Sequence, residues 1–284
     1  MDYPTRRIAG GFAYPEGPRW HGGSLWFSDQ HDGIVRRLSG DGALLESFAV
    51  PGRPSGLGWL PDGRLLVVSM GERRLYRRER DGSLSVHAEL AALHPGESND
   101  MVVDAIGRAW VGNIGFDFHG GDAIRPTTMA RVDPDGSVSV AAVDLVCPNG
   151  TVITPDGRRL IVAESLAHRL CAFDIGTDGT LSGRRLFAQL GQEAVPDGIC
   201  LDAEGCVWVA APFAHAVLRV REGGDIIDRV PVSDGMPYAC MLGGKDRRDL
   251  YICVAPDHDP ARTLMLRAGR IELTTVAVPG AGWP

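Results

Sequence analysis

The sequence predicts an all-β fold: a six-bladed β-propeller with four-stranded antiparallel blades around a central channel, formed by residues 1–284 as one domain. Short apolar runs with strand character recur six times, and a turn of the Asp-Gly type precedes most of them. The 37 glycines and 19 prolines are spread along the chain, as expected for frequent turns. Repeats of roughly 40–50 residues with about four strands each are typical of propeller blades.

The six apolar runs align on one hydrophobic residue each: Trp26, Leu66, Trp110, Ile161, Trp208 and Tyr251. Successive anchors are 40, 44, 51, 47 and 43 residues apart. The runs are too short for helices and rich in aliphatic, β-branched and aromatic residues. A single blade cannot bury both of its faces, but six blades packed radially can, so we expect a closed ring with the anchored runs as its innermost strands.

The segment Arg6–Ala9 is one strand too many for the first blade. We expect it to pair with the last blade near Ile271–Val278 and so close the ring. Closure removes long exposed sheet edges, which otherwise promote aggregation.

Composition excludes several classes of partner. The chain has 29 basic and 36 acidic residues, a net charge of −7, whereas nucleic-acid binding requires a basic stripe. No long apolar stretch predicts a membrane span, and the N-terminus lacks the apolar region of a signal peptide. The six cysteines form no Cys-x-x-Cys pair and lie mostly in apolar runs, as do reduced, buried cysteines. We therefore expect a cytoplasmic monomer or weak dimer that acts on a small molecule.

Polar residues recur at one phase of the repeat, 10 to 13 positions before each anchor: Glu16, Ser55, Asn99, Asn149, Asp197 and Tyr238. We expect these residues to lie in the loops that enter the inner strands and to converge on one mouth of the channel. Pro-x-Gly turn chemistry accounts for the glycine that follows several of them, but it gives no reason for a glutamate at residue 16.

Two carboxylates and two side-chain amides that face one cavity repel each other or stay unsatisfied without a cation. A hard divalent cation accepts oxygen ligands in flexible geometry. Because no Cys or His occurs at this phase, a zinc site of the usual nitrogen and sulfur type is not expected. The sequence therefore predicts one divalent metal ion on the axis.

The motifs Glu16-Gly-Pro-Arg-Trp, Asn99-Asp, Pro148-Asn-Gly and Pro196-Asp-Gly-Ile, in this order and phase, resemble the gluconolactonase, regucalcin (senescence marker protein) and luciferin-regenerating-enzyme family. The resemblance covers nearly the whole chain and implies the same six-bladed fold. It implies that Glu16, Asn149 and Asp197 bind the metal, with Asn99 beside it as a ligand or substrate contact. It also implies that Asp197 is the general base or, as in some relatives, a nucleophile. The family hydrolyses lactones and sometimes phosphoesters with Ca²⁺, Mg²⁺, Mn²⁺ or Zn²⁺; we favour Ca²⁺ here.

One position departs from the family pattern. Sugar-lactone members commonly carry an arginine two residues before the asparagine, and this chain has Glu97 there, which changes the expected substrate preference. The segment Asn113–Thr128 looks long for the family, and we expect it to reshape the mouth of the channel. It contains His119, a candidate substrate contact. Glu97, Ser55 and Tyr238 are further candidate substrate contacts.

These residues predict a metal-dependent lactonase in which Asp197 takes a proton from the attacking water. Two other readings remain open. One is a non-catalytic propeller that binds a protein or a small ligand across its top face. The other is a lyase or isomerase that uses the same metal site.

Overall fold

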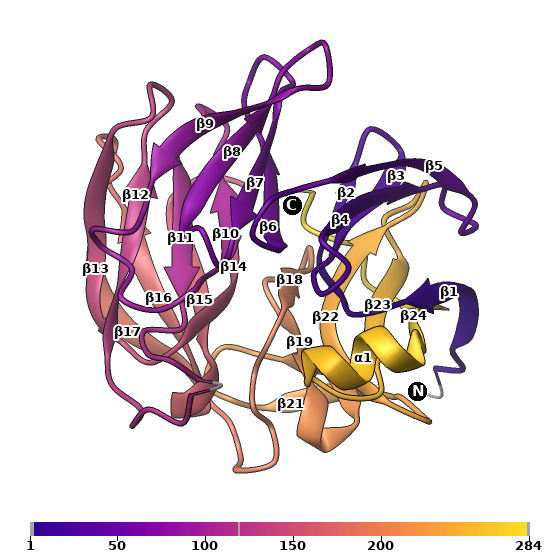
Figure 1. The fold of residues 1–284 in the computed structure, drawn as a ribbon. Helices are drawn as coiled ribbons and strands as arrows, with labels where there is room; N and C mark the ends of the chain where they lie inside the picture. The colour runs from indigo at the N-terminus through magenta and orange to yellow at the C-terminus, as the bar shows by residue number, and fades with distance from the viewer. Residues whose placement is uncertain (1–2, 119, 283–284) are drawn as a thin grey trace.

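The computed structural model describes residues 3–118 and 120–282, and its strands form six four-stranded antiparallel sheets around one axis (Figure 1). This confirms the predicted six-bladed propeller. Blade 1 consists of β2 (Pro15–His21), β3 (Ser24–Asp29), β4 (Ile34–Leu38) and β5 (Leu44–Ala49). Blade 2 consists of β6 (Pro54–Trp59), β7 (Leu65–Ser69), β8 (Arg74–Arg78) and β9 (Leu84–Glu89). Blade 3 consists of β10 (Ser98–Val103), β11 (Ala109–Asn113), β12 (Thr127–Val132) and β13 (Val138–Leu145).

The second half of the ring repeats this order. Blade 4 consists of β14 (Pro148–Ile153), β15 (Arg159–Glu164), β16 (Arg169–Ile175) and β17 (Leu181–Gln189). Blade 5 consists of β18 (Ile199–Leu201), β19 (Val207–Ala211), β20 (Ala216–Val220) and β21 (Ile226–Pro231). Blade 6 consists of β22 (Met236–Gly243), β23 (Asp249–Ala255), β24 (Gly269–Thr275) and, from the other end of the chain, β1 (Arg6–Phe12). Three short helices decorate the blades: η1 (Ser165–Ala167), η2 (Pro212–Ala214) and α1 (Pro260–Leu266).

The N-terminal strand closes the ring as predicted. β1 pairs antiparallel with β24, with Arg6 opposite Leu273 and Ala9 opposite Ile271. Phe12, at the end of β1, is buried and packs edge-on against Phe27 of blade 1, with ring centroids 5.0 Å apart. The first and last segments of the chain therefore share one sheet.

The prediction that the anchored runs are innermost is wrong. The first strand of each blade lies at the axis: β6 contacts β2 and β10, β14 contacts β10 and β18, and β22 contacts β18 and β2. The anchors Trp26, Leu66 and Trp110 lie on second strands. Second strands are buried between neighbouring blades, for example in the cluster that joins Leu66 of blade 2 to Val111 of blade 3, and for that reason carry the strongest apolar signal.

Glycines let the inner strands approach each other closely. A Cβ on Gly150 of β14 would lie 2.5 Å from the carbonyl oxygen of Asp197, and a Cβ on Gly198 would lie 2.4 Å from the Cβ of Ala239. These glycines therefore serve close packing of one blade against the next, besides any role in a turn. The residue before each glycine is held at the wall of the channel.

A buried ion pair crosses the channel below that ring of residues. Arg19 of β2 donates to the carboxylate of Asp100 in β10 at 2.8 Å, and both side chains are almost fully buried. Beyond this pair, at the opposite end of the channel, Gly280 pairs with Asp202 and the amide of Ala281 donates to Leu201. The C-terminal tail thus lies against blade 5 at that end of the channel.

The structure also bears on the expectations for the cysteines and for membrane spans. All six cysteines are buried free thiols. Within the described residues, no helix is both long and apolar enough to span a membrane.

Candidate active site

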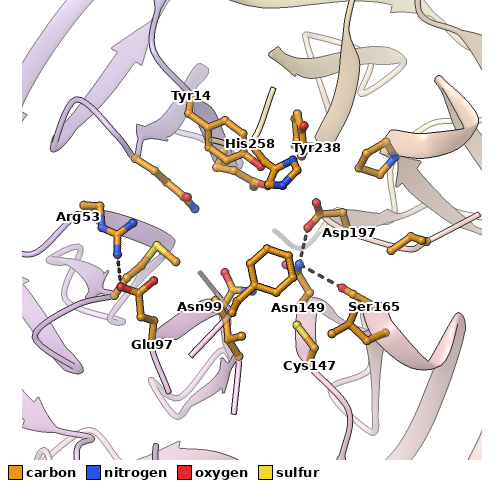
Figure 2. A pocket seen from close by; sticks show the side chains of 18 of the residues that line it. Tyr14, Arg53, Glu97, Asn99, Cys147, Asn149, Ser165, Asp197, Tyr238 and His258 are labelled. Atoms are coloured by element: carbon orange, nitrogen blue, oxygen red, sulfur yellow. Dashed lines mark hydrogen bonds and ion pairs between the residues drawn. The ribbon is translucent and has the colours of Figure 1, made fainter. Parts of the chain in front are cut away.

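A cavity of about 180 Å³ lies at the end of the channel opposite the tail, and residues of all six blades line it (Figure 2). The structure brings Glu16, Asn99, Asn149, Asp197 and Tyr238 to its wall. Each lies on an innermost strand or immediately before one, rather than in a loop entering a second strand. Residues separated by more than 200 positions in the sequence therefore meet because the chain returns to the axis once per blade.

Glu16 is the second residue of β2 and is buried. The amide of Gly17 donates to its carboxylate at 2.7 Å. Burial raises the pKa of Glu16 well above its usual value, and the nearby Asp197 raises it further. Two acidic groups that oppose each other's ionisation thus lie at one cavity.

Asp197 is fixed from two sides. Its amide donates to the carbonyl of Ala210 at 3.0 Å, which holds the backbone, and the side-chain amide of Asn149 donates to its carboxylate. The same nitrogen of Asn149 lies 3.3 Å from the hydroxyl of Ser165 (Figure 2). Burial raises the pKa of Asp197 to about 7, although the hydrogen bond from Asn149 lowers it.

These donors fit a hard divalent cation. The side-chain nitrogen of Asn149 is hydrogen-bonded to Asp197 and Ser165. The side-chain oxygen of Asn149 is then the atom that would bind a metal. Glu16, Asn149 and Asp197 would then supply oxygen atoms only, the donor type that Ca²⁺ and Mg²⁺ prefer. Among residues 3–118 and 120–282, no three His, Cys, Asp or Glu side chains form a cluster suited to a metal, so the amide oxygen is a necessary part of the set.

A hydrogen-bonded chain links the inner ends of blades 1 to 3. The side-chain amide of Gln30 donates to the hydroxyl of Ser55 at 3.1 Å, and that hydroxyl donates to the side-chain oxygen of Asn99 at 3.3 Å. Gln30 and Asn99 line the cavity, whereas Ser55 is buried behind them. The structure therefore places Ser55 where it orients Asn99 rather than where it would touch a ligand.

Glu97 lines the cavity and forms an ion pair with Arg53 of the neighbouring blade (Figure 2). Both side chains are about 30 % exposed. Sequence reasoning missed Arg53, although it stands two residues before Ser55, as Glu97 stands two residues before Asn99. The position of the family arginine is acidic, but a guanidinium from the adjacent blade lies beside it.

Aromatic rings form the wall between blades 1 and 6. Tyr14 stacks on His31 with centroids 4.4 Å apart and lies 4.7 Å from the ring of Tyr238. Burial raises the pKa of Tyr238, as does the charge of Asp197, so this phenol is a neutral hydrogen-bond donor at neutral pH. Tyr14, His31 and His258 also line the cavity and were not predicted.

The long segment after β11 reaches the cavity through Ile114 and Phe118. This agrees with the expectation that the segment shapes the mouth. His119 lies outside the described residues.

A β-propeller with a polar pocket on its axis is the class of protein that this fold and site define. The chain belongs to the SMP-30/gluconolactonase/LRE-like family, whose model matches residues 14–256.

Relatives match nearly the whole chain. It is 30% identical over 271 residues to 6-deoxy-6-sulfogluconolactonase from Pseudomonas putida, covering 92% of this chain and 89% of the relative. It is 27% identical over 245 residues to a pentonolactonase from Haloferax volcanii, covering 84% and 81%. The crystal structure of the calcium-binding protein regucalcin from Agrobacterium tumefaciens strain C58 superposes with a TM-score of 0.84 at 25% identity, covering 100% of this chain and 97% of that one.

Proposed function

We propose that this protein is a divalent-metal-dependent lactonase. The observation that carries the proposal is the meeting of Glu16, Asn149 and Asp197, from three blades, at one cavity. Two relatives that align over most of the chain are named as lactonases, and a solved relative is named as a calcium-binding protein. These names support a lactone as the substrate and Ca²⁺ as the first metal to test.

Each residue has a chemical role in this proposal. A bound divalent cation would polarise the lactone carbonyl and lower the pKa of a neighbouring water. Asp197 accepts the proton from the attacking water. Burial raises its pKa to about 7, and a cation bound to the carboxylate would lower this pKa and keep the group ionised at neutral pH. Asn149 holds the carboxylate of Asp197 in place. The amide of Asn99, whose oxygen accepts from Ser55, has its nitrogen available for the developing oxyanion.

A panel of lactones and aryl esters tests the proposal. δ-Gluconolactone, γ-butyrolactone, dihydrocoumarin and phenyl acetate are incubated with the protein before and after chelation, and then with Ca²⁺, Mg²⁺, Mn²⁺ or Zn²⁺ restored. We expect hydrolysis of at least one lactone, its loss on chelation and its recovery with metal. Undiminished hydrolysis by protein shown to be metal-free would rule out metal dependence. Binding of metal without turnover of any lactone would favour a lyase, an isomerase or a binding protein.

Substitution of the proposed base tests the mechanism. Asp197→Ala and Asp197→Asn are expected to lower kcat by about 10²-fold or more with an unchanged circular-dichroism spectrum. Asp225→Asn, in an exposed turn, is the matched control and should behave as the wild type. Retained turnover in both Asp197 variants would remove this residue from the mechanism.

A further inference from the structure

The cavity has an apolar wall next to the proposed reaction centre, and from it we infer the substrate class: a lactone that carries an alkyl or aryl group, rather than a polyhydroxylated sugar lactone. This inference deepens the proposed lactonase activity and rests on it. Two independent features of the cavity support it: one wall is apolar, and the polar groups are largely hydrogen-bonded to one another.

The apolar wall belongs to blades 4 and 5, the same blades that supply Asn149 and Asp197. Leu166 projects from η1, Phe213 from η2, and Val195 from the segment before β18. Phe213 is 56% exposed. An exposed aromatic side chain at the rim of a concave polar site is typical of a surface that binds ligand.

The two one-turn helices that carry this wall are fixed at both ends. Each follows directly on a second strand and ends at a histidine in the left-handed conformation, His168 after η1 and His215 after η2. The carbonyl of His168 accepts from Leu190, and that of His215 accepts from Val232. The apolar side chains are therefore presented by backbone that is already ordered, which limits the entropy lost on binding.

The polar groups of the cavity are largely bonded to one another. Arg53 pairs with Glu97, Asn149 with Asp197, and Gln30 is linked through Ser55 to Asn99. A sugar lactone presents several hydroxyl groups that each need a partner when they lose water. These pairs occupy part of the hydrogen-bonding capacity that such hydroxyl groups would need, whereas an alkyl or aryl group needs only the apolar wall.

A chain-length series tests the inference on the intact protein. We expect kcat/KM to rise from γ-butyrolactone through γ-hexalactone to γ-octalactone, by about fourfold per buried methylene, and to exceed that for δ-gluconolactone. Phe213→Ser should lower the ratio of kcat/KM for γ-octalactone to that for γ-butyrolactone by at least about fivefold. Leu186→Ser is the matched control, because Leu186 is also 56% exposed but lies on the outer strand β17. It should leave the ratio unchanged.

A binding measurement separates failure of the inference from failure of the lactonase proposal. 2-Butylcyclopentanone and cyclopentanone cannot be hydrolysed, and calorimetry gives their affinities whether or not the protein turns over any lactone. Tighter binding of the butyl ketone that is lost in Phe213→Ser supports the apolar subsite. Equal binding of the two ketones, or a preference for δ-gluconolactone that Phe213→Ser does not alter, overturns the inference and leaves the lactonase proposal standing.

Discussion

The ion pair of Glu97 and Arg53 shows how a residue of a neighbouring blade alters the charge that one side chain presents to the cavity. Taken alone, a glutamate at the rim of the cavity would repel anionic substrates. The guanidinium of Arg53 lies against it and largely cancels its charge. Neither side chain is deeply buried, so water screens the pair and its contribution to stability is small, about 1 kcal/mol or less.

Neutralising Glu97 should therefore alter selectivity more than stability. In Glu97→Gln the guanidinium of Arg53 loses its counter-charge, and we expect KM for the anionic lactone 5-oxotetrahydrofuran-2-carboxylate to fall about fivefold, while that for neutral γ-valerolactone stays within about twofold. Glu46→Gln is the matched control, because Glu46 is also 31% exposed and pairs with Arg78 away from the cavity. Equal changes for both lactones would show that Arg53 does not reach the substrate.

Counting one phase of the repeat was enough to find Glu16, Asn99, Asn149 and Asp197, but it overlooked a second ring. Residues two positions earlier lie in the segments that lead into the inner strands, and most of them line the cavity: Tyr14, Arg53, Glu97, Cys147 and Val195. The same count extended by one step would have identified Arg53. His31 follows the second strand of blade 1 at the position that Leu166 and Phe213 occupy in blades 4 and 5, five residues after each anchor. A count forward from the anchors would therefore have identified it. His258 stands seven residues after its anchor, off that phase, so the repeat does not indicate it.

At the scale of elements, the inner strands depend on glycine where two blades meet. The sequence located these glycines but suggested a turn as their reason. In the structure a side chain on Gly150 would strike the backbone of Asp197 and Ile199. The innermost strand was predicted wrongly for a related reason. Glycines and channel-facing polar residues occupy several positions of each inner strand, so its hydrophobic pattern is weak.

Gly150→Ala is expected to destabilise the protein by roughly 1–3 kcal/mol, because the added methyl group forces β14 away from blade 5. The same shift should separate Asn149 from Asp197 and weaken the proposed metal binding, which calorimetry measures. Gly191→Ala serves as the control, since a Cβ there meets no atom within 4 Å, and its stability in urea unfolding should stay within about 0.5 kcal/mol of the wild type. A Gly150→Ala protein with wild-type stability would contradict this account.

The segment that enters β10 contains a buried histidine that makes the fold sensitive to acid. His94 is fully buried, one ring nitrogen lies 2.8 Å from the hydroxyl of Ser98, and burial lowers its pKa to about 4. The unfolded chain binds a proton near pH 6.5, so this contribution is present above pH 6.5 and is lost as the pH falls toward 4. The loss amounts to about 3 kcal/mol.

Urea unfolding between pH 7.5 and 4.5 tests this contribution. We expect His94→Gln to be less stable than the wild type at pH 7.5 but to lose less stability as the pH falls. His258→Gln, which alters a largely exposed histidine, should keep the wild-type slope. Parallel slopes for His94→Gln and the wild type would assign the acid sensitivity to other groups.

At the scale of the whole molecule, β1 joins the two ends of the ring. This closure was predictable, because an unmatched strand at the N-terminus leaves only the last blade as its partner. We expect a chain that lacks residues 1–12 to lose the burial of Phe12, which alone contributes about 3 to 5 kcal/mol, so Tm should fall by at least about 6 °C. The free edge of β24 should also promote self-association, visible by light scattering.

Leu44→Ala is a suitable control for that deletion, since Leu44 is exposed on the outer strand of blade 1 and its loss should leave Tm nearly unchanged. A truncated chain that melts like the full-length protein and stays monodisperse would show that β1 does not close the ring.

The buried ion pair of Arg19 and Asp100, which crosses the channel beneath the cavity, has a kinetic consequence for the proposed lactonase. In the proposed reaction the hydroxy acid forms on the cavity side of this pair, so we expect it to leave through the same opening by which the next lactone arrives. Departure and arrival then exclude each other, and the ring-opened acid should compete with its own precursor for the free enzyme.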